Sequence, residues 1–278
     1  MCQFCVEHGE GKRWYLNAEN YAYDLSSDLK RRGYVVDFIR GFPKTRATGI
    51  LAGNVLSKLP RSLAQLGGDT ISRNMRPNHF GQPLPIEDVE EVFRLATSIT
   101  VIPCICRMHE PGKSAEEVCI LVTTKPIDDV LLEGFSSYDD GPGLDDFRTI
   151  TADEAMTLVR ECETRGLMHS IWTFQTPFTA AICNCNLESG CMAMKLTAGY
   201  GIKMMWRGEE VATLDEEHCT RCAACKKICP FDAISAGSGR IAFHPEKCWG
   251  CGICRSACKA GAITLVDRRD VPAVAALW

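Results

Sequence analysis

The sequence predicts an α+β fold, with a central α/β layer followed by a small C-terminal domain organised by cysteines. Two observations carry this prediction. Helical and strand-like patterns alternate between residues 85 and 174, and one cysteine spacing occurs twice after residue 211. At 278 residues the chain can form one large core or two modest ones. Its apolar content of 46% is ordinary for a globular protein, whereas its 17 cysteines are not.

The cysteine content bears on the cellular compartment. Many cysteines form disulfides in small secreted chains, but they more often bind metal in larger chains without a signal peptide. Residues 1–30 carry charges throughout and contain no apolar run, which argues against secretion. No window approaches the roughly 20 apolar residues that a membrane span needs. We therefore expect a cytoplasmic metalloprotein without a membrane span.

The formal net charge of −4 is unevenly distributed along the chain. Residues 1–84 carry +5, residues 85–214 carry −11 and residues 215–278 carry +2. This asymmetry favours docking faces for a protein partner. It argues against nucleic-acid binding, because the acidic centre would repel phosphates. An ordinary solvated acidic surface explains the same distribution equally well.

Residues 1–84 are expected to form a helical and irregular segment that wraps over the rest of the chain. Within it, residues 17–32 have apolar side chains at a spacing of four and predict a helix that Gly33 ends. Residues 41–84 are rich in Gly, Pro, Arg and Asn, with short helical possibilities and no compact pattern.

Residues 85–210 are expected to form the α+β domain. Pro85 precedes an acidic first turn and predicts a helix over residues 86–100, because a helix dipole favours acids there. Apolar runs at 101–106 and 118–124 predict two strands. Residues 134–149, which include Gly-Pro-Gly and several aspartates, predict a loop.

The second half of this domain begins with a capping box. Thr151 and Glu154 predict the start of a helix, Gly166 its end, and residues 167–174 a following strand. Cys162 is expected to face the core of this helix as a small apolar side chain. The resulting order, α-β-β-loop-α-β, also occurs in winged-helix modules, which stay open as an alternative. We expect His169 and Trp172, on the last strand, to be structural.

The duplicated spacing lies in residues 211–278, the expected C-terminal domain. Residues 219–230 are CTRCAACKKICP and residues 248–258 are CWGCGICRSAC, so each contains C-x₂-C-x₂-C-x₃-C. Three cysteines on one tight loop suit three corners of an iron–sulfur cubane, and the other repeat supplies the fourth ligand. Zinc ribbons pair two C-x₂-C units without a third and fourth cysteine at this spacing, so zinc is the weaker alternative.

Residues 215–266 resemble the bacterial 2[4Fe-4S] ferredoxin family through these two motifs. The resemblance implies two [4Fe-4S] clusters, which we number I and II. The ligands expected for cluster I are Cys219, Cys222, Cys225 and Cys258, and those for cluster II are Cys248, Cys251, Cys254 and Cys229. Lys259 stands where the family usually has proline. Its backbone N–H and its charge should raise the potential of cluster I.

Nine further cysteines lie upstream. Six of them, excluding Cys2, Cys5 and Cys162, form a second candidate group, and two pairs of these six have the spacing C-x-C. In an extended strand, residues i and i+2 project to one face about 6.6 Å apart, whereas one zinc ion holds its thiolates within about 4 Å. An extended C-x-C therefore suits a cubane better than a single ion. The pairs are Cys104 with Cys106 and Cys183 with Cys185, and the spare candidates are Cys119 and Cys191.

We predict a third iron–sulfur cluster that uses four of these six cysteines. A mononuclear or zinc site and a set of free core cysteines are the alternatives. The core alternative is weaker, because residues 183–191 are expected to form a polar loop. As a whole, the layout resembles 4Fe-4S proteins of anaerobic bacteria and archaea. Those proteins combine an upstream C-x-C-R and C-N-C with a C-terminal dicluster ferredoxin.

The N-terminus contains Cys2, Cys5 and His8. Two thiolates and an imidazole within seven residues suit zinc, a non-covalently bound haem or part of a cluster. They do not form the C-x-x-C-H of covalent haem attachment. A frayed terminus without a metal is the alternative.

Taken together, these motifs predict an iron–sulfur electron-transfer protein or subunit. It would pass low-potential electrons between a donor and a partner oxidoreductase in anaerobic metabolism. The alternative is a small iron–sulfur reductase in which the site predicted at the upstream C-x-C pairs binds the substrate. A redox regulator with a winged-helix core is disfavoured, because the acidic centre would repel DNA. No nucleotide-binding glycine motif and no nucleophile constellation is present, so no catalytic residue is assigned.

Overall fold

The computed structural model describes residues 13–21, 28–75, 77–123, 129–136, 141–175 and 178–276. The predicted N-terminal site at Cys2, Cys5 and His8 lies outside these residues. Within them, no helix is long and apolar enough to cross a membrane.

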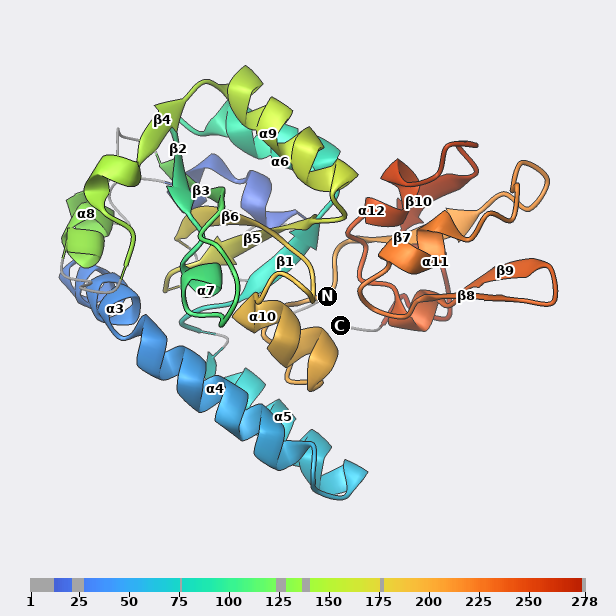
Figure 1. Ribbon diagram of the computed structural model, residues 1–278, viewed down its shortest axis with the longest axis horizontal. Helices are drawn as coiled ribbons and strands as arrows, with labels where there is room; N and C mark the ends of the chain where they lie inside the picture. Colours follow the sequence, from blue (N-terminus) through green and yellow to red (C-terminus); the bar gives the residue numbers. More distant parts are fainter. Residues whose placement is uncertain are drawn as a thin grey trace.

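A six-stranded antiparallel sheet forms the centre of the molecule (Figure 1). Several strands that lie side by side in this sheet, such as β1 and β5, are far apart along the chain. The core therefore depends on tertiary contacts. In spatial order the strands are β1 (Gly81–Leu84), β5 (Met168–Thr173), β6 (Thr179–Cys185), β3 (Glu117–Thr123), β2 (Ser98–Pro103) and β4 (Arg148–Ile150).

Helices cover both faces of this sheet. Because side chains alternate along a strand, Ile120 and Val122 of β3 face one layer, and Cys119 and Leu121 face the other. The first layer contains α6 (Ile86–Leu95) and α9 (Ala152–Thr164). The second layer contains α3 (Leu29–Arg40), α4 (Phe42–Leu56), α8 (Asp129–Ser136) and α10 (Met192–Met194).

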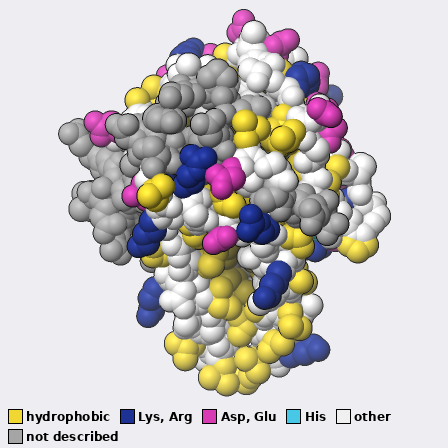
Figure 2. All heavy atoms as spheres, turned by 90° about the vertical axis from the view of Figure 1, so that its left-hand side faces the viewer, with side chains coloured by type: hydrophobic (Ala, Val, Ile, Leu, Met, Phe, Trp, Pro, Cys, Tyr) yellow, Lys and Arg dark blue, Asp and Glu magenta, His cyan; other side chains and the backbone are white. Residues whose placement is uncertain are grey.

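A helical arm extends from the second layer (Figure 1). It consists of α4 and α5 (Arg61–Met75), which are joined by a short turn. Apolar side chains gather at its end (Figure 2), where Leu51, Val55, Leu59, Leu63 and Leu66 are exposed.

The remaining elements are short, and most of them lie in the C-terminal part. They are η1 (Trp14–Leu16), η2 (Ala18–Tyr21), α7 (Ile105–Met108), η3 (Leu144–Asp146), η4 (Lys195–Gly199), β7 (Glu210–Leu214), α11 (Ala224–Ile228), β8 (Ile234–Gly237), β9 (Arg240–Phe243), η5 (Pro245–Lys247), α12 (Ile253–Ser256), β10 (Ile263–Asp267) and η6 (Arg268–Asp270). β7 pairs with β10 and β8 with β9, so residues after 210 form two small sheets of their own.

Several sequence predictions for the α+β layer are confirmed. Helix α9 begins with the predicted capping box, in which the Glu154 N–H donates to Thr151 Oγ1 at 3.2 Å and the Thr151 N–H donates to Glu154 Oε2 at 2.8 Å. Strands β3 and β5 lie where they were predicted. Cys162 is completely buried on α9. The chain therefore has an α+β fold, but its large antiparallel sheet is not a winged-helix arrangement.

Two predictions for the first 84 residues are wrong. The helix α3 begins after Asp28, whose side chain accepts a hydrogen bond from the Arg31 N–H, and it continues through Gly33 to Arg40. A glycine inside a helix costs only about 0.5–1 kcal/mol, which tertiary packing offsets. Residues 41–84, for which the sequence indicated only short helices, contain the two 15-residue helices α4 and α5. The division of the chain into residues 1–84, 85–210 and 211–278 stays a proposal. Strand β1, at the end of the first segment, pairs with β5 and so connects that segment to the large sheet.

Candidate metal centres

The two cysteine repeats of the C-terminal part have the same backbone conformation. Three positions in each repeat adopt left-handed φ angles, and each matches its counterpart in the other repeat. The pairs are Arg221 and Gly250 (φ 59° and 72°), Ala223 and Gly252 (59° and 75°), and Asp232 and Gly261 (52° and 65°). Such turns aim successive backbone N–H groups at one point, which suits the sulfurs of an anionic cluster. The sequence repeat is therefore also a structural repeat.

The four cysteines predicted to bind cluster II line one pocket. Cys251 and Cys254 are buried there, and burial is the main reason why the pKa of Cys254 rises to about 12, followed by the neighbouring Cys248 and Cys229. The Ala212 N–H points at Cys248 Sγ at 3.4 Å. Four thiols around one space, with an N–H donor, fit a [4Fe-4S] cluster, whose positive irons would stabilise the thiolates.

The cysteines predicted to bind cluster I are more accessible. Cys222 is exposed, and the Ala224 N–H followed by the Thr220 hydroxyl lowers its pKa. The Arg221 N–H points at Cys219 Sγ at 3.4 Å. The other two, Cys225 and Cys258, pack in the same apolar cluster as Cys219. That apolar cluster also contains Cys229, Cys248 and Cys254, so the ligand set of cluster I stays a prediction from the sequence.

The repeated loops and their thiols indicate an iron–sulfur domain, and comparisons with known proteins agree. Residues 212–259 match the family model of the 4Fe-4S dicluster domain. The C-terminal part of the chain is therefore a 4Fe-4S dicluster domain.

The matching relatives are similar in this domain alone. An uncharacterized ferredoxin of Methanocaldococcus jannaschii is 40% identical over 52 residues, which are 19% of this chain and 31% of the relative. One component of the Na⁺-translocating ferredoxin:NAD⁺ oxidoreductase complex of Acetobacterium woodii is 47% identical over 49 residues, 17% of this chain and 15% of the relative. The putative electron transport protein YsaA of Escherichia coli is 42% identical over 53 residues, 18% of this chain and 34% of the relative. The chain thus covers about a third or less of these relatives.

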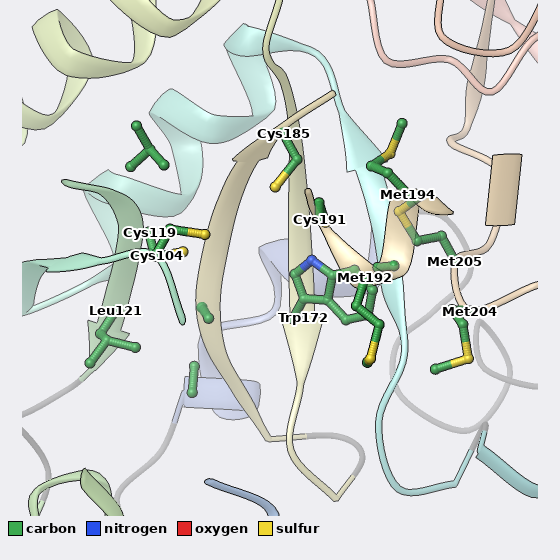
Figure 3. Packing of buried hydrophobic residues seen from close by; sticks show 14 of the residues in the cluster. Cys104, Cys119, Leu121, Trp172, Cys185, Cys191, Met192, Met194, Met204 and Met205 are labelled. Atoms are coloured by element: carbon green, nitrogen blue, oxygen red, sulfur yellow. The ribbon is translucent and has the colours of Figure 1, made fainter. Parts of the chain in front are cut away.

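The upstream cysteines form a second candidate centre, which the comparisons do not cover. All six thiols lie on one face of the large sheet, and each hydrogen-bonds to two others, which closes a ring. Figure 3 shows four of them beside Trp172 and Met192. In order around this six-thiol ring they are Cys104, Cys106, Cys191, Cys185, Cys183 and Cys119.

Several elements bring the ring together. Cys119 lies on β3 opposite Cys183 on β6, and Cys185 ends β6. Cys104 precedes the short helix α7 and Cys191 precedes α10. The two residues that the spacing argument treated as spares, Cys119 and Cys191, are therefore members of the ring.

Two arguments made from the sequence are wrong at this point. Cys104 and Cys106 are not in an extended strand, because β2 ends at Pro103 and Cys106 lies in α7. Their thiols consequently hydrogen-bond to each other. Residues 183–185 are not a polar loop but the end of a sheet strand, and Asn184 is completely buried. Its polar side chain finds partners inside the protein, which the sequence alone did not reveal.

Two sulfurs of the ring are set up as thiolates. Hydrogen bonds from Cys106 and Cys119, and the backbone N–H of Arg107, hold the pKa of Cys104 at about 3. Hydrogen bonds from Cys106 and Cys185 hold the pKa of Cys191 well below its usual value. The described residues contain no group of three His, Cys, Asp or Glu side chains arranged around a single ion.

A buried polar network supports the ring from behind. The guanidinium of Arg107, which is 3% exposed, forms an ion pair with Glu116 and donates to the Asn184 carbonyl at 3.4 Å. The Asn184 side chain donates to the Val118 carbonyl at 2.8 Å and lies 2.5 Å from His169 Nδ1. This network fixes the C-x-C-R segment against the C-N-C strand, and it places a cation near the thiols.

The same network reaches the dicluster domain. His169 Nε2 lies 3.7 Å from Glu163 Oε1, and that oxygen accepts a hydrogen bond from Ser256 Oγ at 2.9 Å. Ser256 belongs to α12, which carries the cluster II ligand Cys254. In addition, Cys251 is part of the same hydrophobic cluster as Cys104, Cys185 and Cys191. Of the two predicted ligand sets, only the cluster II set contributes a described residue, Cys251, to the hydrophobic cluster that contains the six-thiol ring.

An apolar pocket opens in front of the ring. It occupies about 830 Å³ when its open mouth is included. All six thiols line it together with aromatic walls that include Phe38, Phe42, Phe135, Trp172 and Phe174. A neutral imidazole, His79, stacks on Trp172 at 5.0 Å, and its Nδ1–H donates to the Thr173 carbonyl at 2.5 Å. Burial lowers the pKa of His79 to about 4.

Proposed function

We propose that the protein is a cytoplasmic iron–sulfur electron-transfer protein or complex subunit. In this proposal it passes low-potential electrons from a donor to a partner oxidoreductase in anaerobic metabolism. The supporting observation is an asymmetry within the dicluster domain. The predicted cluster I ligand Cys222 is exposed, whereas the predicted cluster II ligand Cys251 is buried in the hydrophobic cluster of the α+β layer. When bound, each cluster would supply one-electron chemistry.

The exposed basic side chains favour the surface around Cys222 as the place where a partner protein docks. Arg221, Lys226, Lys227 and Lys259 are exposed near Cys222. A basic face of this kind suits an acidic surface on the partner and increases the rate of encounter. Cluster I would therefore exchange electrons with a partner protein. Cluster II would pass electrons into the α+β layer, where a third cluster at the six-thiol ring would extend the path.

We expect the isolated protein to be reduced and reoxidised at low potential without converting a small molecule. Electron transfer should require a partner protein and should slow as salt increases, because salt screens exposed charges beyond about 10 Å at 0.1 M. Stopped-flow oxidation of the dithionite-reduced protein by acidic acceptor ferredoxins, at several salt concentrations, measures this dependence. A rate that does not change with salt in wild type and in Lys226→Glu/Lys227→Glu would contradict the docking proposal.

The pocket in front of the six-thiol ring favours a second candidate, a small iron–sulfur reductase. Its aromatic walls suit an uncharged apolar substrate, because ligand pockets are typically lined by apolar and aromatic side chains. On this hypothesis, one of a series of apolar unsaturated compounds, added singly, should change the EPR or Mössbauer spectrum of a metal centre at the six-thiol ring. This change should occur in the absence of a partner protein. If no compound does so while a partner protein still accepts electrons, electron transfer alone is the function.

The N-terminal residues Cys2, Cys5 and His8 keep their predicted role as a further metal or haem site. That role is independent of the electron path proposed above.

A further inference from the structure

We propose that the six-thiol ring is a single site for a polynuclear iron–sulfur cluster that uses all six cysteines as its ligand set. This goes beyond both the dicluster domain and the third cluster on four cysteines predicted from the sequence. It does not depend on which partner the protein serves.

The first argument is that the thiols surround a space instead of filling one. Protein interiors are close-packed and contain few voids larger than a water molecule. A group of free core cysteines would be expected to pack against larger apolar side chains, since each thiol behaves as a small apolar group. Here all six line the same pocket. A cofactor that binds to the thiols would fill this space and replace weak S–H hydrogen bonds by metal–sulfur bonds.

The second argument is that the ring cannot be divided into four ligands and two bystanders. Every sulfur contacts two other members, and the circle closes from Cys119 back to Cys104. A cubane bound by any four would therefore leave two thiols in contact with its ligands. Four of the six thiols come from strands or helix starts that are fixed by the sheet, namely Cys104, Cys119, Cys183 and Cys185. The backbone of each of these four residues is therefore held in place beside the pocket.

The third argument concerns charge. Six thiolates in an apolar pocket are stable only if nearby positive charge compensates them. The buried guanidinium of Arg107 supplies one such charge. If all six sulfurs bind metal they become thiolates, and a core with more irons than a cubane would compensate their charge better. Soft thiolate ligands also suit zinc and Cu(I), but the ring shares its hydrophobic cluster with Cys251 of the dicluster domain, which favours a redox-active iron–sulfur centre.

The test is the iron and acid-labile sulfide content of the full-length protein, purified and reconstituted without oxygen. The dicluster domain accounts for about eight irons, and a third cubane would bring the total to about twelve. We expect more than about twelve. Each of Cys104→Ala, Cys106→Ala, Cys119→Ala, Cys183→Ala, Cys185→Ala and Cys191→Ala should lower this total towards eight.

Cys162→Ala is the matched control. Cys162 is completely buried in the same hydrophobic cluster but is not part of the ring, so its removal should leave the iron content unchanged. The EPR signals of the dicluster domain report in every variant whether the protein has folded.

Three results would overturn the proposal. A content of eight irons in the wild type, with the thiols of the ring unchanged by reconstitution, would show that the six residues are free core cysteines. Twelve irons together with two ring variants that bind as much iron as wild type would identify a four-ligand cubane. Zinc or copper without additional sulfide would identify a different metal site. In each of these cases the electron-transfer proposal can still hold, because it depends on the dicluster domain.

Discussion

Cys251→Ala is expected to remove cluster II and also to weaken the contact between the dicluster domain and the α+β layer. Cys251 is 8% exposed and packs in the hydrophobic cluster that contains the six-thiol ring. Losing a metal ligand loses the free energy by which the metal stabilises the fold. The iron content should fall by about four per chain, and the thermal unfolding temperature of the full-length protein should decrease.

Cys222→Ala is the matched comparison, because Cys222 is an exposed ligand of the other predicted set. It should also remove about four irons, but it should leave the EPR signal of cluster II and the unfolding temperature closer to wild type. Anaerobic metal analysis, EPR and differential scanning calorimetry measure these effects. Equal thermal destabilisation by the two variants would show that cluster II does not have the stabilising position inferred for it.

Gly250→Ala should strongly destabilise the dicluster domain even though no ligand changes. Gly250 has a φ of +72°, and a Cβ at this position would lie 2.3 Å from the Glu210 carbonyl oxygen. That carbonyl cannot move easily, because Glu210 is paired with Asp267 between β7 and β10. The left-handed conformation costs about 1–2 kcal/mol for a residue with a Cβ, and the overlap adds about 1–3 kcal/mol. We expect a loss of about 2–5 kcal/mol in the free energy of unfolding.

Gly239→Ala separates the two contributions. Gly239 has almost the same φ, +71°, but a Cβ there would have no neighbour within 4 Å. This variant should therefore show only the backbone cost of about 1–2 kcal/mol. Anaerobic denaturant unfolding, with iron release recorded in parallel, compares the two variants. If Gly250→Ala is no less stable than Gly239→Ala, the close approach of Glu210 does not constrain this loop.

Local signals in the sequence predicted a large part of the fold. The capping box of Thr151 and Glu154 located the start of α9, and the apolar run around Ile120 located β3. These predictions succeeded because capping and strand alternation depend on residues close together in the chain. The dicluster domain was recognisable for the same reason, since three ligands of each cluster lie on one short loop.

The predictions that failed depended on distant parts of the chain. Helix α4 has a weak amphipathic pattern, and contacts such as that of Gly53 with the Tyr200 ring position it. Asn184 made residues 183–185 resemble a loop, whereas partners on other elements, including His169, satisfy it inside the sheet. A polar side chain can be buried when the fold provides its hydrogen bonds, and the sequence does not show those partners.

The sequence by itself therefore determined the dicluster domain, because its cysteine spacing is a local property of two short loops. Only the tertiary structure decided that six upstream cysteines form one ring. The pairing of β3 with β6 places Cys119 opposite Cys183, and α7 and α10 bring Cys104 and Cys191 to the same face of the sheet. Strand order and register depend on which apolar faces pack together across the whole core. The C-x-C spacings predicted a shared site for four of these six cysteines, but the spacing could not show that all six line one pocket.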